Sequence, residues 1–339
     1  MNLPTLSVCL SNYNHARFLP NALQSILSQS YQPLEVIVID NASTDHSAEV
    51  LRAFAQRSPS IQVILNRTNV GSVVSYNHFI NLARGDYCYI ADADDIVLDG
   101  FLEKSMRILT QYPHAGLCST LSWMINEQGH RLGLCFSNPF RSKQPCYLNP
   151  QKALLTLMNY GSWILGNTTI YHRRTLLGVG GFNPQLGPFA DGLIRQVIVA
   201  KQGACFIPEP LGAWRRMETG YSALTGSNPE TAKTTCSVTI NLMRTIYRDL
   251  LPESYVQRWQ RRWLFSSVTA FAKKIEKEWI VGLRVLFENH GGLQALVLRV
   301  ACSIIRVTSW MVQLLAGIFL LRGDICRRVL FKLHPSAIE

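Results

Sequence analysis

The sequence lacks the cysteine patterns that zinc-binding and disulfide-stabilised proteins use. Its nine cysteines are scattered singly, without a Cys-x-x-Cys motif or a paired spacing near histidines. Residues 1–7 contain no basic leader and no cleavage signal. These absences exclude a zinc framework and a disulfide scaffold, and we expect a reducing, cytosolic location. With 339 residues, the chain is long enough for one large domain with an appendage or for two domains.

Acidic residues are scarce in the last third of the chain, which leaves that part strongly basic. Residues 1–239 contain 18 basic and 15 acidic residues, a net charge of +3, whereas residues 240–339 contain 15 and 7, a net charge of +8. The basic segment also lacks interleaved aromatic residues on an open face, which a nucleic acid would need for stacking. We therefore expect no nucleic acid partner, while an anionic membrane or an acidic partner remains open.

The densest group of acids follows a run of strand length. Residues 87–91 are aromatic and apolar, and they end at Asp92, Asp94 and Asp95. Because side chains alternate along an extended chain, Asp92 and Asp94 point to the same side and can share one hard cation. Mg²⁺ or Mn²⁺ held by one or two carboxylates and by phosphate oxygens is a usual way to bind a nucleoside diphosphate. The alternative is a solvated acidic turn, which this motif alone favours.

Apolar strands recur along the first 92 residues and alternate with helical patterns. The expected strands are residues 6–10, 35–39, 61–65 and 87–91. This order predicts an α/β fold, a Rossmann-type and mostly parallel sheet between helices. Because ligands gather at the carboxyl ends of parallel strands, we expect the polar residues there to converge. These residues are Asn12, Tyr13, Asp40, Asn69, Asp92 and Asp94, while Asn41 and Ser43 are interpreted as helix-capping residues.

Taken in order, these and later motifs resemble those of the inverting, metal-dependent nucleotide-sugar glycosyltransferases of family 2, which have the GT-A fold. The resemblance spans about residues 5–222. Each motif is weak alone, but their order is specific. The motifs are Ser7-Val8-x-x-Ser11-x-Tyr13-Asn14, Glu35-Val36-x-Val38-Ile39-Asp40, Asn69-x-Gly71, Ala83-Arg84-Gly85-Asp86-Tyr87, Asp92-Ala93-Asp94-Asp95, Gly180-Gly181-Phe182, Ala190-Asp191, and Trp214-Arg215 with Ser222.

The resemblance implies a donor site made by the matching residues. Ser11, Tyr13 and Asp40 would hold the base of the donor, and Asn69 would join them at the same edge. Arg84 and Asp92 would lie near the ribose and the diphosphate. Asp94 would bind a divalent metal ion, Mn²⁺ or Mg²⁺, with Asp92 as a ribose or metal contact. Arg215 could clamp the same phosphates with both branches of its guanidinium.

Asp191 matches the general base of the family, which takes the proton of the acceptor hydroxyl. The alternative is that Asp191 only caps a helix that begins at Gly192. Where family members often have Asp-Asp and Glu-Asp, this chain has Asp40-Asn41 and Ala190-Asp191. His15 and His172 are interpreted as structural, with a direct role left open.

The expected function is the transfer of a single sugar from a nucleotide-diphosphate sugar, preferably a UDP-sugar, to a lipid-linked or cell-surface polysaccharide acceptor. Family members that extend polymers processively carry Gln-x-x-Arg-Trp, and residues 260–263, Gln-Arg-Arg-Trp, are one residue short of that motif. We interpret them as a surface patch and expect a non-processive enzyme. A nucleotidyltransferase is disfavoured because residues 11–17 contain neither glycine nor lysine. A non-catalytic nucleotide-sugar-binding scaffold is the other alternative, motivated by Ala190 and Asn41.

The two expected domains are residues 1–226, which bind the donor and carry out catalysis, and residues 227–339, a basic helical region. Residues 293–321 are mostly apolar, with Arg299, Arg306 and Gln313 seven residues apart. Their uninterrupted apolar part, residues 307–321, is shorter than the roughly 20 residues that span a bilayer. We favour an interfacial helix on the cytoplasmic face of the plasma membrane. Packing against the catalytic domain, packing against a second copy of the chain, and a true span are alternatives.

Overall fold

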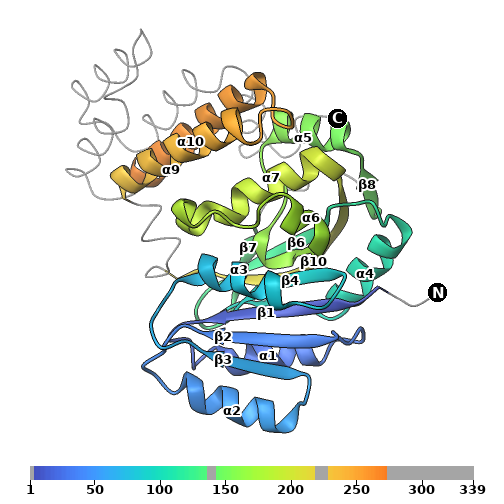
Figure 1. The fold of residues 1–339 in the computed structure, drawn as a ribbon, viewed down its shortest axis with the longest axis vertical. Helices are drawn as coiled ribbons and strands as arrows, with labels where there is room; N and C mark the ends of the chain where they lie inside the picture. The colour runs from blue at the N-terminus through green and yellow to red at the C-terminus, as the bar shows by residue number, and fades with distance from the viewer. Residues whose placement is uncertain (1–3, 136–142, 218–227, 273–339) are drawn as a thin grey trace. The chain divides into compact units, whose positions relative to one another are not determined.

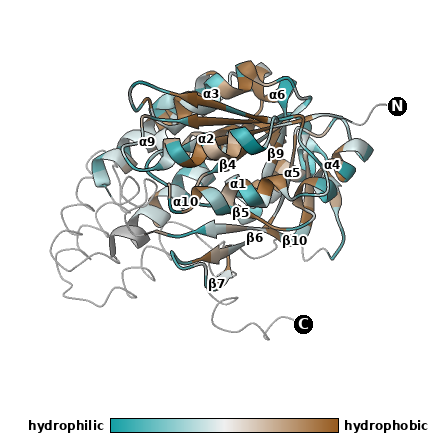
Figure 2. Ribbon diagram, turned by 90° about the horizontal axis from the view of Figure 1, so that it is seen from below, coloured by the Kyte–Doolittle hydropathy of each residue, from teal (hydrophilic) through white to brown (hydrophobic). Residues whose placement is uncertain are grey.

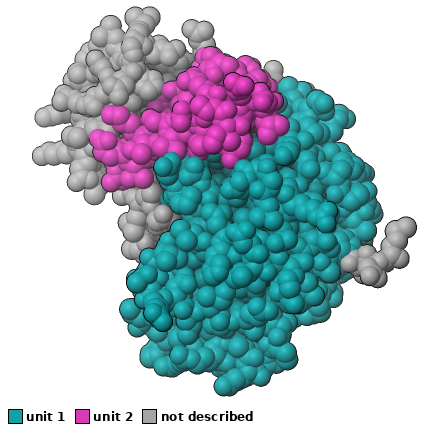
Figure 3. Space-filling view, viewed as in Figure 1, with its two compact units in different colours: residues 1–157, 162–217 teal, residues 158–161, 218–339 magenta. Residues whose placement is uncertain are grey.

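The computed structural model describes residues 4–135, 143–217 and 228–272. The chain divides into two compact units, coloured in Figure 3. Unit 1 contains residues 1–157 and 162–217, and unit 2 contains residues 158–161 and 218–339. Each unit is treated by itself.

Unit 1 is built from strands and helices that alternate through its first half (Figure 1). Its strands are β1 (Leu6–Asn12), β2 (Glu35–Asp40), β3 (Ile61–Leu65), β4 (Tyr87–Asp92), β5 (Ile96–Val97), β6 (Leu117–Ile125), β7 (Arg131–Leu134), β8 (Cys146–Leu148), β9 (Thr169–His172) and β10 (Ala204–Arg215). Its helices are α1 (Leu19–Leu27), α2 (Ser47–Arg57), α3 (Ser72–Leu82), α4 (Phe101–Gln111), α5 (Pro150–Tyr160, ending in unit 2), α6 (Arg173–Gly178) and α7 (Ala190–Gln202), with short 3₁₀ segments η1 (Gly166–Thr168) and η2 (Pro184–Phe189).

The strands form one mostly parallel sheet in the order β3-β2-β1-β4-β9-β6-β10-β5, with β7 beside β6 and β8 beside β10. Strands β3, β2, β1 and β4 are parallel to one another. Strand β9 is antiparallel to both of its neighbours, β4 and β6. The predicted α/β sheet between helices, the layout of the GT-A fold, is confirmed. The antiparallel insertion of β9 was not predicted.

The sheet is covered by helices on both faces, and its central strands are therefore mostly apolar, with polar residues near their ends. Every residue of β1 and β2 is buried. Figure 2 shows the apolar colour concentrated on the strands, with α3 and α6 on one side of the sheet and α1 and α2 on the other. A strand with two covered faces reads as a continuous apolar run rather than as an alternating one, which explains the sequence pattern.

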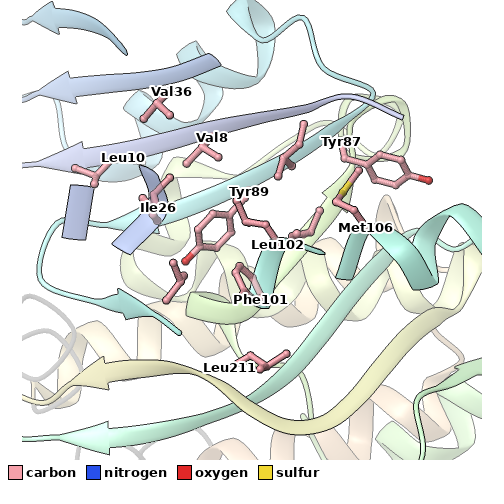
Figure 4. Close-up of a cluster of buried hydrophobic side chains, with 14 of the residues drawn as sticks. Val8, Leu10, Ile26, Val36, Tyr87, Tyr89, Phe101, Leu102, Met106 and Leu211 are labelled. Carbon is pink, nitrogen blue, oxygen red and sulfur yellow. The ribbon is translucent and has the colours of Figure 1, made fainter. Parts of the chain in front are cut away.

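A core cluster lies between the sheet and helices α1 and α4 (Figure 4). Leu19, Leu23 and Ile26 recur at helical spacing on α1 and are buried against it. The rings of Tyr89 and Phe101 meet edge to face, with centroids 5.0 Å apart. Full burial of each such side chain contributes about 1.5–3 kcal/mol. This cluster holds the strand ends that carry the polar residues.

The amino ends of the strands approach so closely that one position requires glycine. A Cβ added at Gly85 would lie 2.6 Å from the backbone nitrogen of Ser7. The Ser7 hydroxyl accepts a hydrogen bond from Gly85 N–H at 2.9 Å and donates one to Glu35 Oε1 at 2.6 Å. Arg84 Nε donates to Glu35 Oε2 at 2.9 Å. This edge of the sheet is thus closed by protein groups.

Unit 2 contains the helices α9 (Pro229–Thr245) and α10 (Glu253–Ala272). Asn228 caps α9, since its side chain accepts from Thr231 N–H at 3.1 Å. Trp263 of α10 donates its indole N–H to the carbonyl of Ala232 at 3.1 Å and stacks on Trp259. The interpretation of residues 260–263 as a surface patch is therefore wrong for Trp263, which joins the two helices.

The predicted interfacial segment, residues 293–321, lies outside the described residues. Among the helices that the structure describes, none combines the length and the hydropathy needed to cross a bilayer.

Candidate functional site

The ends of β1 and β2 are joined through the carboxylate of Asp40, which is 2% exposed. Its Oδ1 accepts from Asn12 Nδ2 and from the Ser43 hydroxyl, both at 2.6 Å. Its Oδ2 accepts from the backbone N–H of Ser43 at 3.0 Å. Ser43 therefore binds Asp40 and does not cap α2 as expected. Asn12 Oδ1 is buried with no hydrogen-bond donor among the described residues.

Asn41 connects three neighbouring segments and does not cap a helix either. Its Nδ2 donates to the Ser11 hydroxyl at 3.3 Å, and its Oδ1 accepts from Ser75 Oγ and Asn66 Nδ2, both at 2.9 Å. The residue at the N-cap of α2 is His46. The end of β1, the end of β2 and the start of α3 are held together by this amide.

Two of the predicted donor-binding residues are accessible to a ligand. The Tyr13 side chain, in the loop after β1, is 43% exposed. Asn69, in the loop after β3, is exposed and accepts a hydrogen bond from Gly71 N–H at 2.9 Å. An exposed phenol ring and an exposed amide can meet a planar base and its polar edge.

Asp92, the last residue of β4, lies beside Ser11 in the sheet register. Tyr76 of α3 donates its hydroxyl to Asp92 Oδ1 at 2.6 Å. Removal from bulk water and the nearby Asp94 carboxylate raise the pKa of Asp92 to about 7, although the Tyr76 hydrogen bond opposes them. The residue keeps solvent-exposed surface, so a ligand can reach it.

Arg215, the last residue of β10, holds the turn that follows Asp92. Its backbone N–H donates to Asp95 Oδ1 at 2.8 Å and its Nε donates to the Asp94 carbonyl at 2.8 Å. Its Nη1 donates to the carbonyls of Asn126 at 2.9 Å and Glu127 at 2.8 Å. Two guanidinium nitrogens are thus used by the protein. In this arrangement Arg215 positions the Asp94 backbone, and its clamp on phosphates stays a prediction.

The acids of this turn repel one another in a partly dehydrated place. Burial, followed by the Asp94 and Asp92 carboxylates, raises the pKa of Asp95. Burial also raises the pKa of Asp94, with the charges of His15 and Arg215 opposing it. Asp95 Oδ2 is buried and has no hydrogen-bond donor in the described part of the chain. Crowded carboxylate oxygens with too few donors are the ligand set that a hard divalent cation fits.

The described residues contain no group of three His, Cys, Asp or Glu side chains arranged as a complete metal site. Asp92 and Asp94 would therefore hold a cation together with oxygens from outside the protein. Mg²⁺ is commonly held in this way, by one or two carboxylates plus substrate phosphates. The residues present fit a metal that arrives with a diphosphate.

Asp191 is the second residue of α7, which begins at Ala190. The N-cap residue of this helix is Phe189, whose side chain makes no capping hydrogen bond. The alternative interpretation, in which Asp191 caps a helix starting at Gly192, is therefore wrong. The Asp191 carboxylate instead forms an ion pair with Arg195, one turn further along the helix.

Asp191 lies close enough to the β4 edge to act on it electrostatically. Its negative charge is among the causes that raise the pKa values of Asp92 and Tyr76. Tyr76 also packs edge to face on Phe182, with ring centroids 5.6 Å apart. Phe182 belongs to the Gly-Gly-Phe turn before α7. The start of α7 and the end of β4 therefore face the same space.

Arg84 does not lie at this edge. It precedes β4 and binds Glu35, the first residue of β2, whereas Asp92 and Asp40 end the same two strands. Five residues of extended strand separate Glu35 from Asp40, a distance of roughly 17 Å. The expectation that Arg84 approaches the ribose and the diphosphate is wrong, because its guanidinium binds at the opposite end of the sheet.

The two histidines lie at different edges of the sheet. His172 Nδ1 meets the Thr175 hydroxyl at 3.0 Å, and its ring packs on Tyr87 at the amino end of β4. Its interpretation as structural fits this capping position. His15 lies near the acidic turn, where its charge opposes the rise in the pKa of Asp94.

Sequence reasoning missed three partners of the site. Tyr76, which binds Asp92, sits in a helix without a motif, and no signal pointed to it. Arg195 could have been found, since residues four apart on a helix face each other. Arg17 and Arg215 both stack on Phe18, with guanidinium carbons 5.0 Å and 4.6 Å from the ring centroid, respectively.

A cavity of about 540 Å³ lies elsewhere, between α1, β5 and the Pro210–Leu211 part of β10. None of the acids of the site lines it. Its lining residues are Asn21, Gln24, Ser25, Ser28, Ile96, Val97, Leu98, Asp99, Pro210 and Leu211.

Comparison with known proteins finds one family over the first half of the chain. Residues 7–153 match the family model described as glycosyl transferase family 2. A putative glycosyltransferase, EpsE, of Bacillus subtilis is 36% identical over 129 residues, which cover 38% of this chain and 46% of that protein. Glycosyltransferase GlyG of Streptococcus pneumoniae is 35% identical over 98 residues, covering 29% of this chain and 33% of that protein. The chain thus spans less than half the length of these curated relatives.

Solved structures resemble the chain over nearly its whole length. TarS 1–349 of S. aureus, in complex with UDP-GlcNAc, matches with a TM-score of 0.62 at 16% identity, covering 96% of this chain and 92% of that one. The mannosyltransferase PcManGT of Pyrobaculum calidifontis, in complex with GDP-Man and Mn²⁺, matches with a TM-score of 0.55 at 18% identity, covering 95% and 88%. At these identities the likeness concerns the fold.

Proposed function

Because residues 7–153 form a glycosyltransferase family 2 domain, we propose that the protein is an inverting glycosyltransferase. It moves a single sugar from a nucleotide-diphosphate sugar to a hydroxyl of an acceptor. One observation carries the proposal. Asp92, which ends β4, binds the Tyr76 hydroxyl, and the Tyr76 ring packs on Phe182 shortly before α7, where Asp191 lies, although about 100 residues separate Asp92 from Asp191 in the sequence. Such convergence supports an acidic metal-diphosphate site with a base beside it.

The donor is a nucleoside diphosphate sugar, preferably a UDP-sugar. Tyr13 and Asn69 are exposed, and Ser11 and Asp40 end the two strands beside them, which supports a base-binding role for this group. TarS and PcManGT were solved with UDP-GlcNAc and with GDP-Man, respectively. Both ligands are nucleotide-diphosphate sugars, which supports that class of donor here.

Asp191 accepts the proton of the acceptor hydroxyl. As that proton leaves, the hydroxyl oxygen forms a bond to the anomeric carbon of the sugar. The bond between this carbon and the diphosphate oxygen breaks on the opposite face, and its electron pair leaves with the diphosphate. A single displacement of this kind inverts the anomeric centre. Such a step needs a base near the diphosphate site, and the position of Asp191 at the start of α7 supports this role.

Asp94, with Asp92, would hold the divalent cation, Mn²⁺ or Mg²⁺. When bound, it supplies a Lewis acid that stabilises the charge developing on the diphosphate. Tyr76 fixes one oxygen of Asp92, and Arg215 fixes the backbone carbonyl of Asp94. These contacts orient both carboxylates before a donor arrives.

The acceptor belongs to a lipid-linked or cell-surface polysaccharide, and the protein works peripherally on the cytoplasmic face of the plasma membrane. The basic excess of residues 240–339 and the apolar segment 293–321 support this placement. Truncation after residue 292 followed by cell fractionation tests it. A truncated protein that stays wholly in the membrane pellet would refute anchoring by this segment.

The test of function is a panel of UDP- and GDP-sugars, each with Mn²⁺ and with EDTA. We expect one donor to raise the melting temperature and to be hydrolysed slowly, with both effects lost in EDTA. Asp191→Ala should keep the donor-dependent stabilisation and lose hydrolysis. Binding without turnover in the native protein would instead favour a scaffold, and diphosphate release from a nucleoside triphosphate would favour a nucleotidyltransferase.

A further inference from the structure

The Asp191 carboxylate is held from behind by a buried cation. Arg195 Nη1 forms an ion pair with Asp191 Oδ2. The Arg195 side chain is only 10% exposed, whereas that of Asp191 is 36% exposed. The pair therefore has a buried end and an accessible end. An exposed pair at this spacing on a helix contributes little to stability, but a buried guanidinium is costly to keep unless it is paired.

Arg195 has no other carboxylate to neutralise it among the described residues. Its second partner is the Tyr171 hydroxyl, and its Nε is buried without an acceptor in the described part of the chain. Burial alone would lower the pKa of Arg195, but Asp191 and Tyr171 raise it above its ordinary value. The buried positive charge of Arg195 is therefore neutralised by Asp191.

The backbone of η1 forms a wall against this pair. A Cβ added at Gly166 would lie 2.6 Å from Arg195 Nη1 and 2.6 Å from Asp191 Oδ2. A side chain at this position would force one or both of these groups to shift. Gly166 and Arg195 thus enclose Oδ2, while no described residue donates a hydrogen bond to Oδ1.

We propose that Arg195 is a positioning residue for the transfer step, and that Gly166 provides the backbone wall that keeps it there. Together they fix Oδ2 of Asp191, so that Oδ1 alone faces the incoming hydroxyl. The proposal rests on the proposed function.

The experiment measures steady-state hydrolysis of whichever nucleotide sugar the native protein turns over fastest, with Mn²⁺ and with water as the acceptor. We expect Arg195→Gln to lower kcat about 100-fold, as misplacement of a reacting group does. The KM and the thermal stabilisation by the donor should stay within about twofold, because Arg195 does not touch the donor. Arg195→Lys should recover part of kcat, since it keeps the charge without the planar fork.

Gly166→Ala is a second way to displace the Asp191 carboxylate. It should lower kcat as strongly as Arg195→Gln while leaving both charged residues in place. Lys201→Gln, which removes an exposed cation from the same helix, is the matched control and should leave kcat unchanged. If Arg195→Gln does not fold, Arg195→Lys and Gly166→Ala decide.

Folded variants that turn over the donor at the native rate would overturn the positioning role, as would a loss confined to KM. A native protein that turns over no nucleotide sugar would refute the proposed function itself. The two failures are therefore distinguishable.

Discussion

The two edges of the strands β2, β1 and β4 carry acids in opposite electrostatic states. At the amino edge, burial alone would raise the pKa of Glu35, but hydrogen bonds from Ser7 and Arg84 outweigh it and lower the pKa. The backbone N–H of Thr5 lowers the pKa of Asp86 at the same edge. Each of these acids is matched by donors in the protein.

At the carboxyl edge, the pKa values of Asp92, Asp94 and Asp95 are all raised, with burial as the main cause. The protein supplies few donors to these three carboxylates, whereas Asp40, at the same edge, accepts hydrogen bonds from Asn12 and Ser43. We therefore interpret Glu35 and Asp86 as acids that stabilise the fold, and Asp92, Asp94 and Asp95 as acids that bind a ligand. Changes at the carboxyl edge should cost activity, and changes at the amino edge should cost stability.

The largest expected effect is at Asp94. Asp94→Asn should lower turnover of the donor by about 10³-fold, similar to the removal of a main transition-state stabiliser. The same change relieves like-charge repulsion, so the melting temperature without donor should stay the same or rise. Turnover and thermal unfolding of one preparation check both parts. A large drop in melting temperature would mean that Asp94 stabilises the fold, and the proposed difference between the two edges would then be wrong.

Arg215→Gln comes next, because it releases the turn without removing an acid. We expect a loss of about 10- to 100-fold in Mn²⁺ affinity or turnover, the usual effect of a residue that orients a metal ligand. Titration of donor hydrolysis with Mn²⁺ measures it. Arg216→Gln, one position further, is the matched control. Equal effects of both changes would mean that only the charge of this segment matters.

Glu35→Gln should weaken the hydrogen bonds that Ser7 and Arg84 donate at the amino edge. We expect a loss of about 2–3 kcal/mol in unfolding free energy, less than for a fully buried pair because Arg84 is partly exposed. Since folding lowers the pKa of Glu35, its stabilisation is present above the unfolded pKa of about 4.3 and is lost as the pH falls through the folded value. Urea unfolding between pH 3 and about pH 7 should therefore show a shallower acid loss in the variant. Turnover per folded molecule should not change.

The smallest expected effect is at Arg84, whose side chain is 64% exposed. Arg84→Ala should cost about 1 kcal/mol or less in stability and leave the KM for the donor unchanged. A tenfold rise in KM would return Arg84 to the donor site and contradict its position at the amino edge.

Most of the sheet could be predicted because its strands are buried on both faces and their apolar runs are continuous. The acids and amides that end β1, β2 and β4 could be placed at one edge by the rule for parallel strands alone. Arg84 was misplaced because its motif precedes a strand, and a motif does not say which end of the sheet its side chain reaches. The Asp191 helix was predicted two residues short, since Phe189 at the N-cap gives no sequence signal.

The partners of the site were harder to predict. Arg215 is held by the carbonyls of Asn126 and Glu127, and backbone acceptors leave no trace in residue identity. Gly166 looks like any glycine in a turn, yet its lack of a side chain is what lets the Asp191–Arg195 pair form. These contacts depend on segments brought together only by the fold.

The late position of strand β9 in the sequence affects how the sheet forms during synthesis. Strands β1, β2, β3 and β4 come from the first 92 residues, and one helix connects each to the next, whereas β9 joins β4 about 80 residues later. At a synthesis rate of roughly 5–20 residues per second, the free edge of β4 stays unpaired on the ribosome for several seconds. We expect this interval to be the point at which the nascent chain is most prone to wrong pairing and most in need of a chaperone.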